Sequence, residues 1–221
     1  MVNDTADRTE RGPGRGAGTR EAIMAAAERL YAEHGLSTVS NRQIGEAAGQ
    51  GNTTVVSYHF GSKTALVHTI MTRHGTAVDA LRRRHVEAVG ESDDVRDWVR
   101  CLVRPVTEHL DTLGVPSWQA RFTVQALTDP LMRAVVTDES LTRESLWHTL
   151  RELGRCLGPA VPADVRRERA DMARHLILHT CAEHERALAA GTAQPGASWQ
   201  RTARALEDAL VGLLTAPVTH R

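Results

Sequence analysis

The sequence has few aromatic residues, a single lysine and no long apolar run. Phe, Trp and Tyr make up 4% of the 221 residues, and Lys63 is the only lysine among 27 basic residues. No apolar stretch approaches the roughly 18 residues that a membrane-spanning helix needs. The first residues are polar and rich in glycine, without an apolar signal segment. We therefore expect a soluble, intracellular protein.

The net charge and the number of cysteines are both low, and each excludes one class of protein. The formal net charge is +0, so any surface that binds nucleic acid must be a local patch and not a property of the whole molecule. The three cysteines, Cys101, Cys156 and Cys181, are odd in number, far apart and set in apolar helical patterns. This arrangement predicts reduced, buried thiols in a cytoplasmic protein and argues against a disulfide framework.

Helix-forming residues dominate what is present. Ala, Leu, Arg and Glu are well represented, and these favour α-helix. Apolar residues recur at helical spacing, and Gly and Pro separate the periodic segments. No segment reads convincingly as a strand, so we predict an all-α fold. The expected helices cover residues 19–34, 40–48, 53–59, 62–89, 93–113, 117–128, 137–157, 162–190 and 198–214.

Residues 1–18 lack periodicity and end in a run rich in glycine. Two interpretations stay open for this segment. It is a disordered tail, or it is a basic arm that contacts DNA through Arg11 and Arg15. A phosphate-binding glycine loop is excluded, because no Gly-Lys-Ser/Thr follows and no strand precedes it.

Two short helices joined by a glycine turn follow the first long helix. Ser40-Asn41-Arg42-Gln43 is a capping box that opens the first of them, with Ile44, Ala47 and Ala48 predicted on its buried face. Gly49-Gln50-Gly51 forms the turn, Asn52 can cap the second helix, and Val56 is its expected buried residue. A long helix followed by such a pair is typical of a helix-turn-helix, whose second helix fits the major groove of DNA.

Three segments closely resemble the N-terminal domain of TetR-family transcriptional regulators. They are Ala26-Ala-Glu-Arg-Leu-Tyr-Ala-Glu-His-Gly35, Ser40-Asn-Arg-Gln-Ile-Gly-Glu-Ala-Ala-Gly49 and Tyr58-His-Phe-Gly-Ser-Lys-Thr-Ala-Leu66. The resemblance covers residues 19–70, and the turn at Gln50-Gly51 is one residue longer than is usual in the family. It implies a DNA-binding helix-turn-helix domain at 19–65 and a larger helical ligand-binding and dimerisation domain at 66–215. It also implies a homodimeric repressor that a small-molecule ligand releases from operator DNA.

The chemistry of the exposed side chains suggests how such a domain would contact DNA. Small hydroxyl residues approach base edges closely, and an arginine reads guanine. The phenol of Tyr58, the imidazole of His59 and the ammonium of Lys63 lie at predicted helix ends, where they can donate hydrogen bonds to phosphate oxygens. The resemblance also implies a base contact for Arg42 and backbone contacts for Ser40 and Asn41. The predicted DNA-binding residues are Ser40, Asn41, Arg42, Thr53, Thr54, Ser57, Tyr58, His59 and Lys63.

The C-terminal part offers two further predictions. The last predicted helix carries an apolar stripe that other helices must bury. The resemblance suggests that these helices belong to the second subunit of a twofold dimer. Packing against helices of the same subunit is the alternative. The predicted dimer-interface residues are Trp199, Leu206, Leu210 and Leu213. Aromatic and polar residues on three other helices are candidates for an effector pocket, with ordinary core packing as the alternative. These candidates are Trp118, Arg121, Phe122, Gln125, Trp147, His175 and His179.

No catalytic, metal or cofactor motif stands out. His175 and His179 are spaced to chelate a metal, but no third ligand falls at a suitable spacing. An enzyme that uses Cys181 with His184 is one alternative class, although no orienting third group is evident. A DNA-binding protein without an effector is the other.

Overall fold

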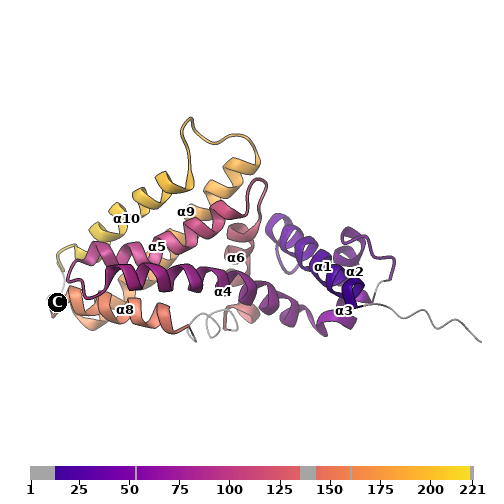
Figure 1. Cartoon of the computed structure of the whole chain (residues 1–221), viewed down its shortest axis with the longest axis horizontal. Helices are drawn as coiled ribbons and strands as arrows, with labels where there is room; N and C mark the ends of the chain where they lie inside the picture. Colours follow the sequence, from indigo (N-terminus) through magenta and orange to yellow (C-terminus); the bar gives the residue numbers. More distant parts are fainter. Residues whose placement is uncertain (1–12, 53, 135–142, 160, 220–221) are drawn as a thin grey trace, which may run out of the picture.

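The computed structural model describes residues 13–52, 54–134, 143–159 and 161–219 (Figure 1). All regular secondary structure in these ranges is helical, and the all-α fold is as predicted. The helices are α1 (Pro13–His34), α2 (Asn41–Ala47), α3 (Val55–Phe60), α4 (Lys63–Val89), α5 (Val95–Thr112), α6 (Gln119–Thr128), α8 (Glu144–Leu157), α9 (Ala163–Ala189) and α10 (Trp199–Thr215).

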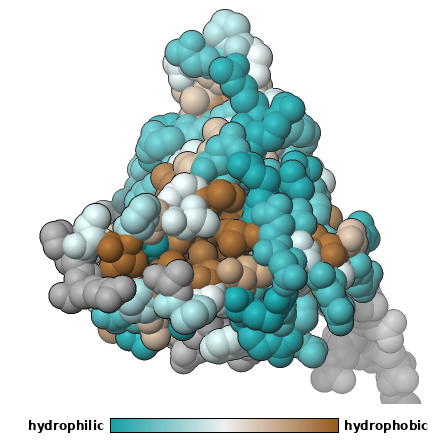
Figure 2. Space-filling model, turned by 90° about the vertical axis from the view of Figure 1, so that its left-hand side faces the viewer, coloured by the Kyte–Doolittle hydropathy of each residue, from teal (hydrophilic) through white to brown (hydrophobic). Residues whose placement is uncertain are grey.

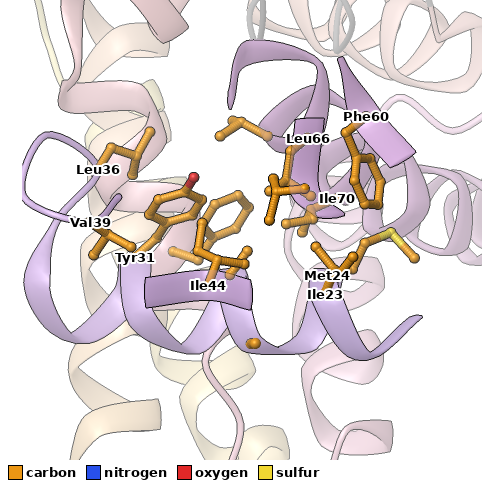
Figure 3. Close-up of a cluster of buried hydrophobic side chains, with 14 of the residues drawn as sticks. Ile23, Met24, Tyr31, Leu36, Val39, Ile44, Phe60, Leu66 and Ile70 are labelled. Atoms are coloured by element: carbon orange, nitrogen blue, oxygen red, sulfur yellow. The ribbon is translucent and has the colours of Figure 1, made fainter. Parts of the chain in front are cut away.

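The N-terminal domain is built from α1, α2, α3 and the first turns of α4. Its core includes Ile23, Tyr31, Ile44 and Leu66, each with 0% of its surface exposed. Figure 3 shows these side chains converging from different helices on one apolar cluster. Short helices such as α2 and α3 have little stability of their own, so this shared core is what holds them in place.

The C-terminal domain packs around α5. The second hydrophobic core includes Trp98 and Val103 on α5 and Leu206 and Leu210 on α10. The helix α4 runs from the N-terminal domain along the whole C-terminal domain, and α8 lies beside it (Figure 1). The two domains are therefore joined by one continuous helix.

At the end of the molecule remote from α3, apolar side chains gather in the middle of a hydrophilic surface (Figure 2).

The stripe predicted for the dimer interface is covered within the subunit. Trp199, Leu206 and Leu210 are 5%, 2% and 0% exposed, and Leu213 is half-buried. These side chains belong to the second hydrophobic core, against α5 and α9. Helices of the same chain already remove the apolar surface of these three buried residues from water, which agrees with the alternative of packing inside the subunit. Contact of this stripe with a twofold mate stays a prediction.

Several helix ends differ from the sequence predictions. The first helix begins at Pro13 and not after Thr19, so the glycine-rich run Pro13–Gly18 is helical. The helix predicted from residue 137 is described from Glu144 onward, and residues 135–142 lie outside the described ranges. On α2, Ala47 is exposed and Gly45 is buried in its place. A Cβ at Gly45 would lie 3.3 Å from Val55, so the missing side chain lets α2 and α3 approach closely.

None of the helices in the described part of the chain combines the length and the apolar character that crossing a membrane requires.

Candidate functional site

The outer face of α3 carries small hydroxyl groups and one aromatic ring. Thr54 and Ser57 are exposed, and Tyr58 has 83% of its surface exposed, while Val55 and Val56 face the core. The predicted helix register, with Val56 buried, is therefore confirmed. The Asn52 side chain accepts hydrogen bonds from the backbone N–H and the hydroxyl of Thr54, at 2.9 and 2.8 Å. Thr53 lies outside the described residues.

The start of α2 lies beside this face. Ser40 caps α2 with the predicted capping box, in which its hydroxyl accepts from the Gln43 backbone and its own N–H donates to the Gln43 side chain. The Asn41 amide donates to the Ser57 hydroxyl at 3.5 Å, which links the two helices. Arg42 is exposed and pairs only with Glu46, at 3.3 Å, among the described residues. Its guanidinium is therefore held loosely and faces solvent.

Arg20 of α1 fixes the far end of α3, and the sequence analysis missed this contact. Its Nη1 donates to the carbonyl of His59 at 2.7 Å, and its guanidinium lies 4.2 Å above the Phe60 ring. A cation at a helix C-terminus meets the unpaired carbonyls that carry the negative end of the helix dipole. His59 is half-buried at this end. Arg20 therefore positions α3 relative to α1.

Lys63 makes different contacts from those predicted. Its ammonium donates to the carbonyl oxygens of Leu36 and Val39, the latter at 2.9 Å, and lies 5.4 Å from the Tyr31 ring centroid. Partial burial lowers the pKa of the ammonium from its usual value, and Asp129 acts in the opposite direction. In this structure the lysine closes the loop between α1 and α2, and its predicted contact with a phosphate stays a prediction.

Three residues predicted for an effector pocket instead lie at the junction between the domains. The Phe122 ring is fully buried and stacks on Tyr31 of α1, with ring centroids 6.1 Å apart. The Trp118 indole donates to Glu33 of α1 at 3.2 Å, and a Cβ at Gly35 would lie 3.5 Å from the Gln125 amide. These residues, in α6 and at its N-cap, hold the N-terminal domain, because their side chains face α1.

Arg121 has a different partner again. Its Nε donates to Glu185 of α9 at 3.0 Å, and the Glu185 carboxylate is 1% exposed. The same carboxylate accepts from the Ser117 hydroxyl and from the backbone N–H groups of Ala120 and Arg121. An acidic side chain at a helix N-terminus satisfies donors that the helix leaves unpaired. Glu185 therefore anchors the start of α6 on α9.

The remaining pocket candidates are not gathered around one cavity. Trp147 lies on α8 with 55% of its surface exposed. His175 and His179 are exposed on α9, with ring centroids 6.3 Å apart. They line a surface pocket of about 240 Å³ together with Arg133 and Arg174, among others. The structure thus divides the predicted pocket among the domain junction, α8 and the outer face of α9.

A buried polar chain crosses from α1 to α5, and the sequence analysis did not find it. The carboxylate of Glu28 lies 3.0 Å from Nε2 of His74, and Nδ1 of His74 lies 2.9 Å from Nε2 of His109. Because a carboxylate accepts, Nε2 of His74 is the donor toward Glu28. In the neutral form of His74, Nδ1 then accepts from the Nε2–H of His109. Burial, and then the neighbouring His74, lowers the pKa of His109 to about 4. The residues stand on three helices, so no spacing along the chain reveals them.

Comparison with known proteins gives one match to a protein family. Residues 23–70 match the family model of bacterial regulatory proteins, tetR family. This match spans most of α1, all of α2 and α3, and the start of α4. No curated protein sequence matches the chain.

Two similar solved structures are TetR-type regulators. One is the TetR-like transcriptional regulator LfrR from Mycobacterium smegmatis in complex with proflavine. It is 20% identical over 92% of this chain and 99% of that chain, with a TM-score of 0.46. The other is a TetR-family regulator from Streptomyces coelicolor A3, 22% identical over 93% of this chain and 98% of that chain, with a TM-score of 0.43.

Proposed function

We propose that this chain is a homodimeric repressor whose operator affinity is lowered by a small-molecule effector. The premise is the match of residues 23–70, which identifies the chain as a member of the tetR family of bacterial regulatory proteins and hence as a DNA-binding transcriptional regulator. The observation that carries the proposal is the outer face of α3. Thr54, Ser57 and Tyr58 are exposed there on a helix whose other side is locked into the core. The proposal includes a cytoplasmic location, because a regulator of this kind acts on operator DNA.

The proposal assigns the two kinds of contact to different residues. Thr54 and Ser57 are short enough to meet base edges, with Thr53 beside them in sequence, and Arg42 is free to turn from Glu46 toward a guanine. Tyr58 and His59 contact phosphates, as do Ser40 and Asn41 at the start of α2. Phosphate contacts set the position of the domain, and base contacts set its sequence preference.

Dimerisation is part of the proposal because one helix-turn-helix makes too few contacts for tight, specific binding. With the apolar stripe of α10 covered inside the subunit, the outer face of α9 is the better candidate for the interface. Met172 and Leu176 on this face are 53% and 36% exposed. Large apolar side chains that stay exposed together commonly mark an interaction surface.

The path from effector to DNA follows from how the domains are joined. The helix α4 is shared by both domains, and α6 stacks Phe122 on Tyr31 of α1. A shift of α4 or α6 must therefore move α1, and with it α3. A ligand that prefers the shifted arrangement lowers operator affinity by the same differential free energy, typically about 1–3 kcal/mol.

The enzyme alternative has little support in the C-terminal domain. Its proposed nucleophile, Cys181, is 1% exposed, and burial raises the pKa of the thiol to about 12. A nucleophilic cysteine needs a lowered pKa and access to substrate. We therefore favour a regulator that catalyses no reaction.

Footprinting of the purified protein across its own genome tests the proposal. The expected result is a small number of sites with twofold symmetry, whose half-sites lie about 10–10.5 base pairs apart or a multiple of this. Mobility shift with one such site, repeated with Tyr58→Ala and with the exposed control Val115→Ala, then links binding to α3. Uniform binding to all DNA, without preferred sites, would contradict the proposal. Binding that no compound weakens would favour a regulator without an effector.

A further inference from the structure

The pocket of about 240 Å³ between α6 and α9 has an apolar floor. Val124 and Leu127 of α6 and Leu178 of α9 line it, and all three are half-buried. Val124 packs against the second hydrophobic core, and Leu127 packs against the core of the N-terminal domain. The pocket therefore lies beside both cores, at a place where apolar surface stays open to solvent.

The rest of the pocket is lined mainly by basic side chains. Arg133, which follows α6, and Arg174, His175 and His179 of α9 lie around the floor together with Thr128. Among the lining residues that the structure describes, none is acidic. The guanidinium of Arg133 forms no ion pair within the described ranges. Ligand pockets commonly combine an apolar wall with a few polar groups that fix the orientation of the ligand, and here the polar groups are suited to an anion.

Arg174 already has a partner, and that partner lies outside the pocket. Its Nη2 donates to Asp171, one turn earlier on α9, at 3.1 Å. Asp171 is exposed and does not line the pocket. Ion pairs between exposed side chains of one helix contribute little stability, so Arg174 can exchange this carboxylate for another anion. With Asp171 counted, the two arginines and this one carboxylate still carry one positive charge in excess.

The chemistry and the size of the pocket define a class of ligand. A guanidinium binds a carboxylate or a phosphate through two parallel hydrogen bonds, and a histidine ring N–H is a further donor. Pockets for drug-sized ligands measure roughly 300–1,000 Å³, so this smaller one suits a single ring. We propose that the pocket between α6 and α9 binds a small aromatic acid, with its oxyanion on Arg133 and Arg174 and its ring on the apolar floor. The inference rests on the proposed function, because it names the chemical class of the effector.

The position of the pocket suits an effector of a dimeric regulator. The helix α6 is one of its walls, and Phe122 of the same helix stacks on Tyr31 of α1. A ligand that displaces α6 therefore displaces α1 as well. Residues two apart on a helix point about 200° apart, so Arg174 faces away from Met172 and Leu176 of the proposed interface. A dimer formed through that face leaves Arg174 accessible.

NMR titration of the full chain tests the proposal without DNA. The probes are benzoate and phenyl phosphate. Benzamide and benzylamine are the neutral and the cationic control, and acetate and inorganic phosphate are the controls that lack a ring. We expect the aromatic acids to shift the ring signals of His175 and His179 saturably, with His175→Gln and His179→Gln assigning these signals. The signals of His148 of α8, which lines a different pocket, should not move. The tighter of the two acids shows whether the arginines prefer a carboxylate or a phosphate.

Two variants test the arginines, each against a matched change. Arg174→Gln is compared with Arg186→Gln, because Arg186 of α9 is exposed and also pairs with an acid three residues earlier, Glu183. Arg133→Gln is compared with Arg84→Gln, at an exposed position of α4. Each pocket variant should weaken binding of the aromatic acids about tenfold or more, because hydrogen bonds to a charged group are lost. The two control variants should bind them as the wild type does.

Equal binding of benzamide and benzoate would overturn the proposal, because the arginines would then not recognise the charge. Equal binding of inorganic phosphate and phenyl phosphate would overturn it too, because it would show an adventitious ion only. The same holds if Arg174→Gln weakens binding no more than Arg186→Gln, or if neither aromatic acid shifts His175 and His179 saturably. Failure of the proposed function appears separately, as absence of operator binding in a mobility shift without any probe.

Discussion

Tyr31 of α1 and Phe122 of α6 stack with their ring centroids 6.1 Å apart, so α6 contributes to the hydrophobic core of the N-terminal domain. Both rings are fully buried. Domains that meet through small polar contacts move independently by default, whereas a large apolar contact restrains them. The orientation of the helix-turn-helix is therefore set by the helices behind it.

Removing the Phe122 ring should destabilise this junction. Phe122→Ala leaves a cavity beside Tyr31, and such changes cost about 3–5 kcal/mol. Chemical denaturation followed by circular dichroism measures the loss, with Leu131→Ala, at a residue 80% exposed, as the control. A cost no larger than that of the control would show that the two rings do not support each other.

Arg42→Ala should weaken specific DNA binding by about 1–3 kcal/mol and relax the preference at one base pair of each half-site. The reason is that the Arg42 side chain is exposed on α2 with only Glu46 as a partner among the described residues. Competition binding across a set of operator variants measures it, with Arg84→Ala as a control remote from α2 and α3. An unchanged sequence preference in the variant would remove Arg42 from the base-reading residues.

Lys63→Met tests whether the only lysine is structural. Two carbonyl oxygens, of Leu36 and Val39, would lose their donor, and leaving such groups unpaired costs about 1–3 kcal/mol of folding free energy. Thermal unfolding measures this loss. If stability is unchanged while the log–log salt dependence of operator binding falls by about 0.9 per subunit, the lysine acts on a phosphate instead.

The buried histidine pair predicts a loss of stability in mild acid. The pKa of His109 is lowered to about 4 in the folded protein, whereas an unfolded histidine titrates near 6.5. Between these values the unfolded chain binds the extra proton, so the free energy of unfolding decreases as the pH falls from 6.5 to 4, by up to about 3 kcal/mol. Above pH 6.5 this group adds no pH dependence. Urea unfolding at pH 7.5 and pH 5 measures it, and His109→Gln should flatten the difference while the exposed His34→Gln does not.

Leu210→Ala and Met172→Glu should separate folding from dimerisation. Leu210 is 0% exposed inside the subunit, so its truncation should cost about 2–5 kcal/mol of stability. Met172 is half-exposed on α9, so a carboxylate there should split a dimer and leave the subunit folded. Thermal unfolding measures the loss of stability, and sedimentation measures the loss of the dimer. A Met172→Glu protein that remains dimeric would place the interface elsewhere.

Much of the fold follows from local patterns in the sequence. Ser40 and Gln43 predict the start of α2, and Val56 predicts the register of α3, because capping and helical periodicity act over a few residues. The start of α1 was missed since glycine has a low helix propensity, yet the run from Pro13 is helical. Local propensity is overridden there by continuity with the helix that follows.

The candidate sites were harder to predict because they depend on contacts between distant helices. Periodicity shows that Leu206 and Leu210 need a cover, but it does not say whether the cover is α5 or a second subunit. Likewise, an aromatic residue such as Phe122 looks the same in sequence whether it lines a pocket or packs against α1. The buried charges Arg82 and Glu185 carry no local signal, because polar residues within helical patterns are normally exposed.

The position of Lys63 gives this chain a chemical reporter. It carries the only ε-amino group in the sequence, and that amine is held by two loop carbonyls beneath Tyr31. The amine loses these two acceptors when the loop between α1 and α2 opens, so an amine-reactive acylating reagent should modify it faster in the open state. The rate of acylation at this one position, followed by mass spectrometry, would therefore report local opening of the DNA-reading domain, without an engineered label and separately from the unfolding of the helices behind it.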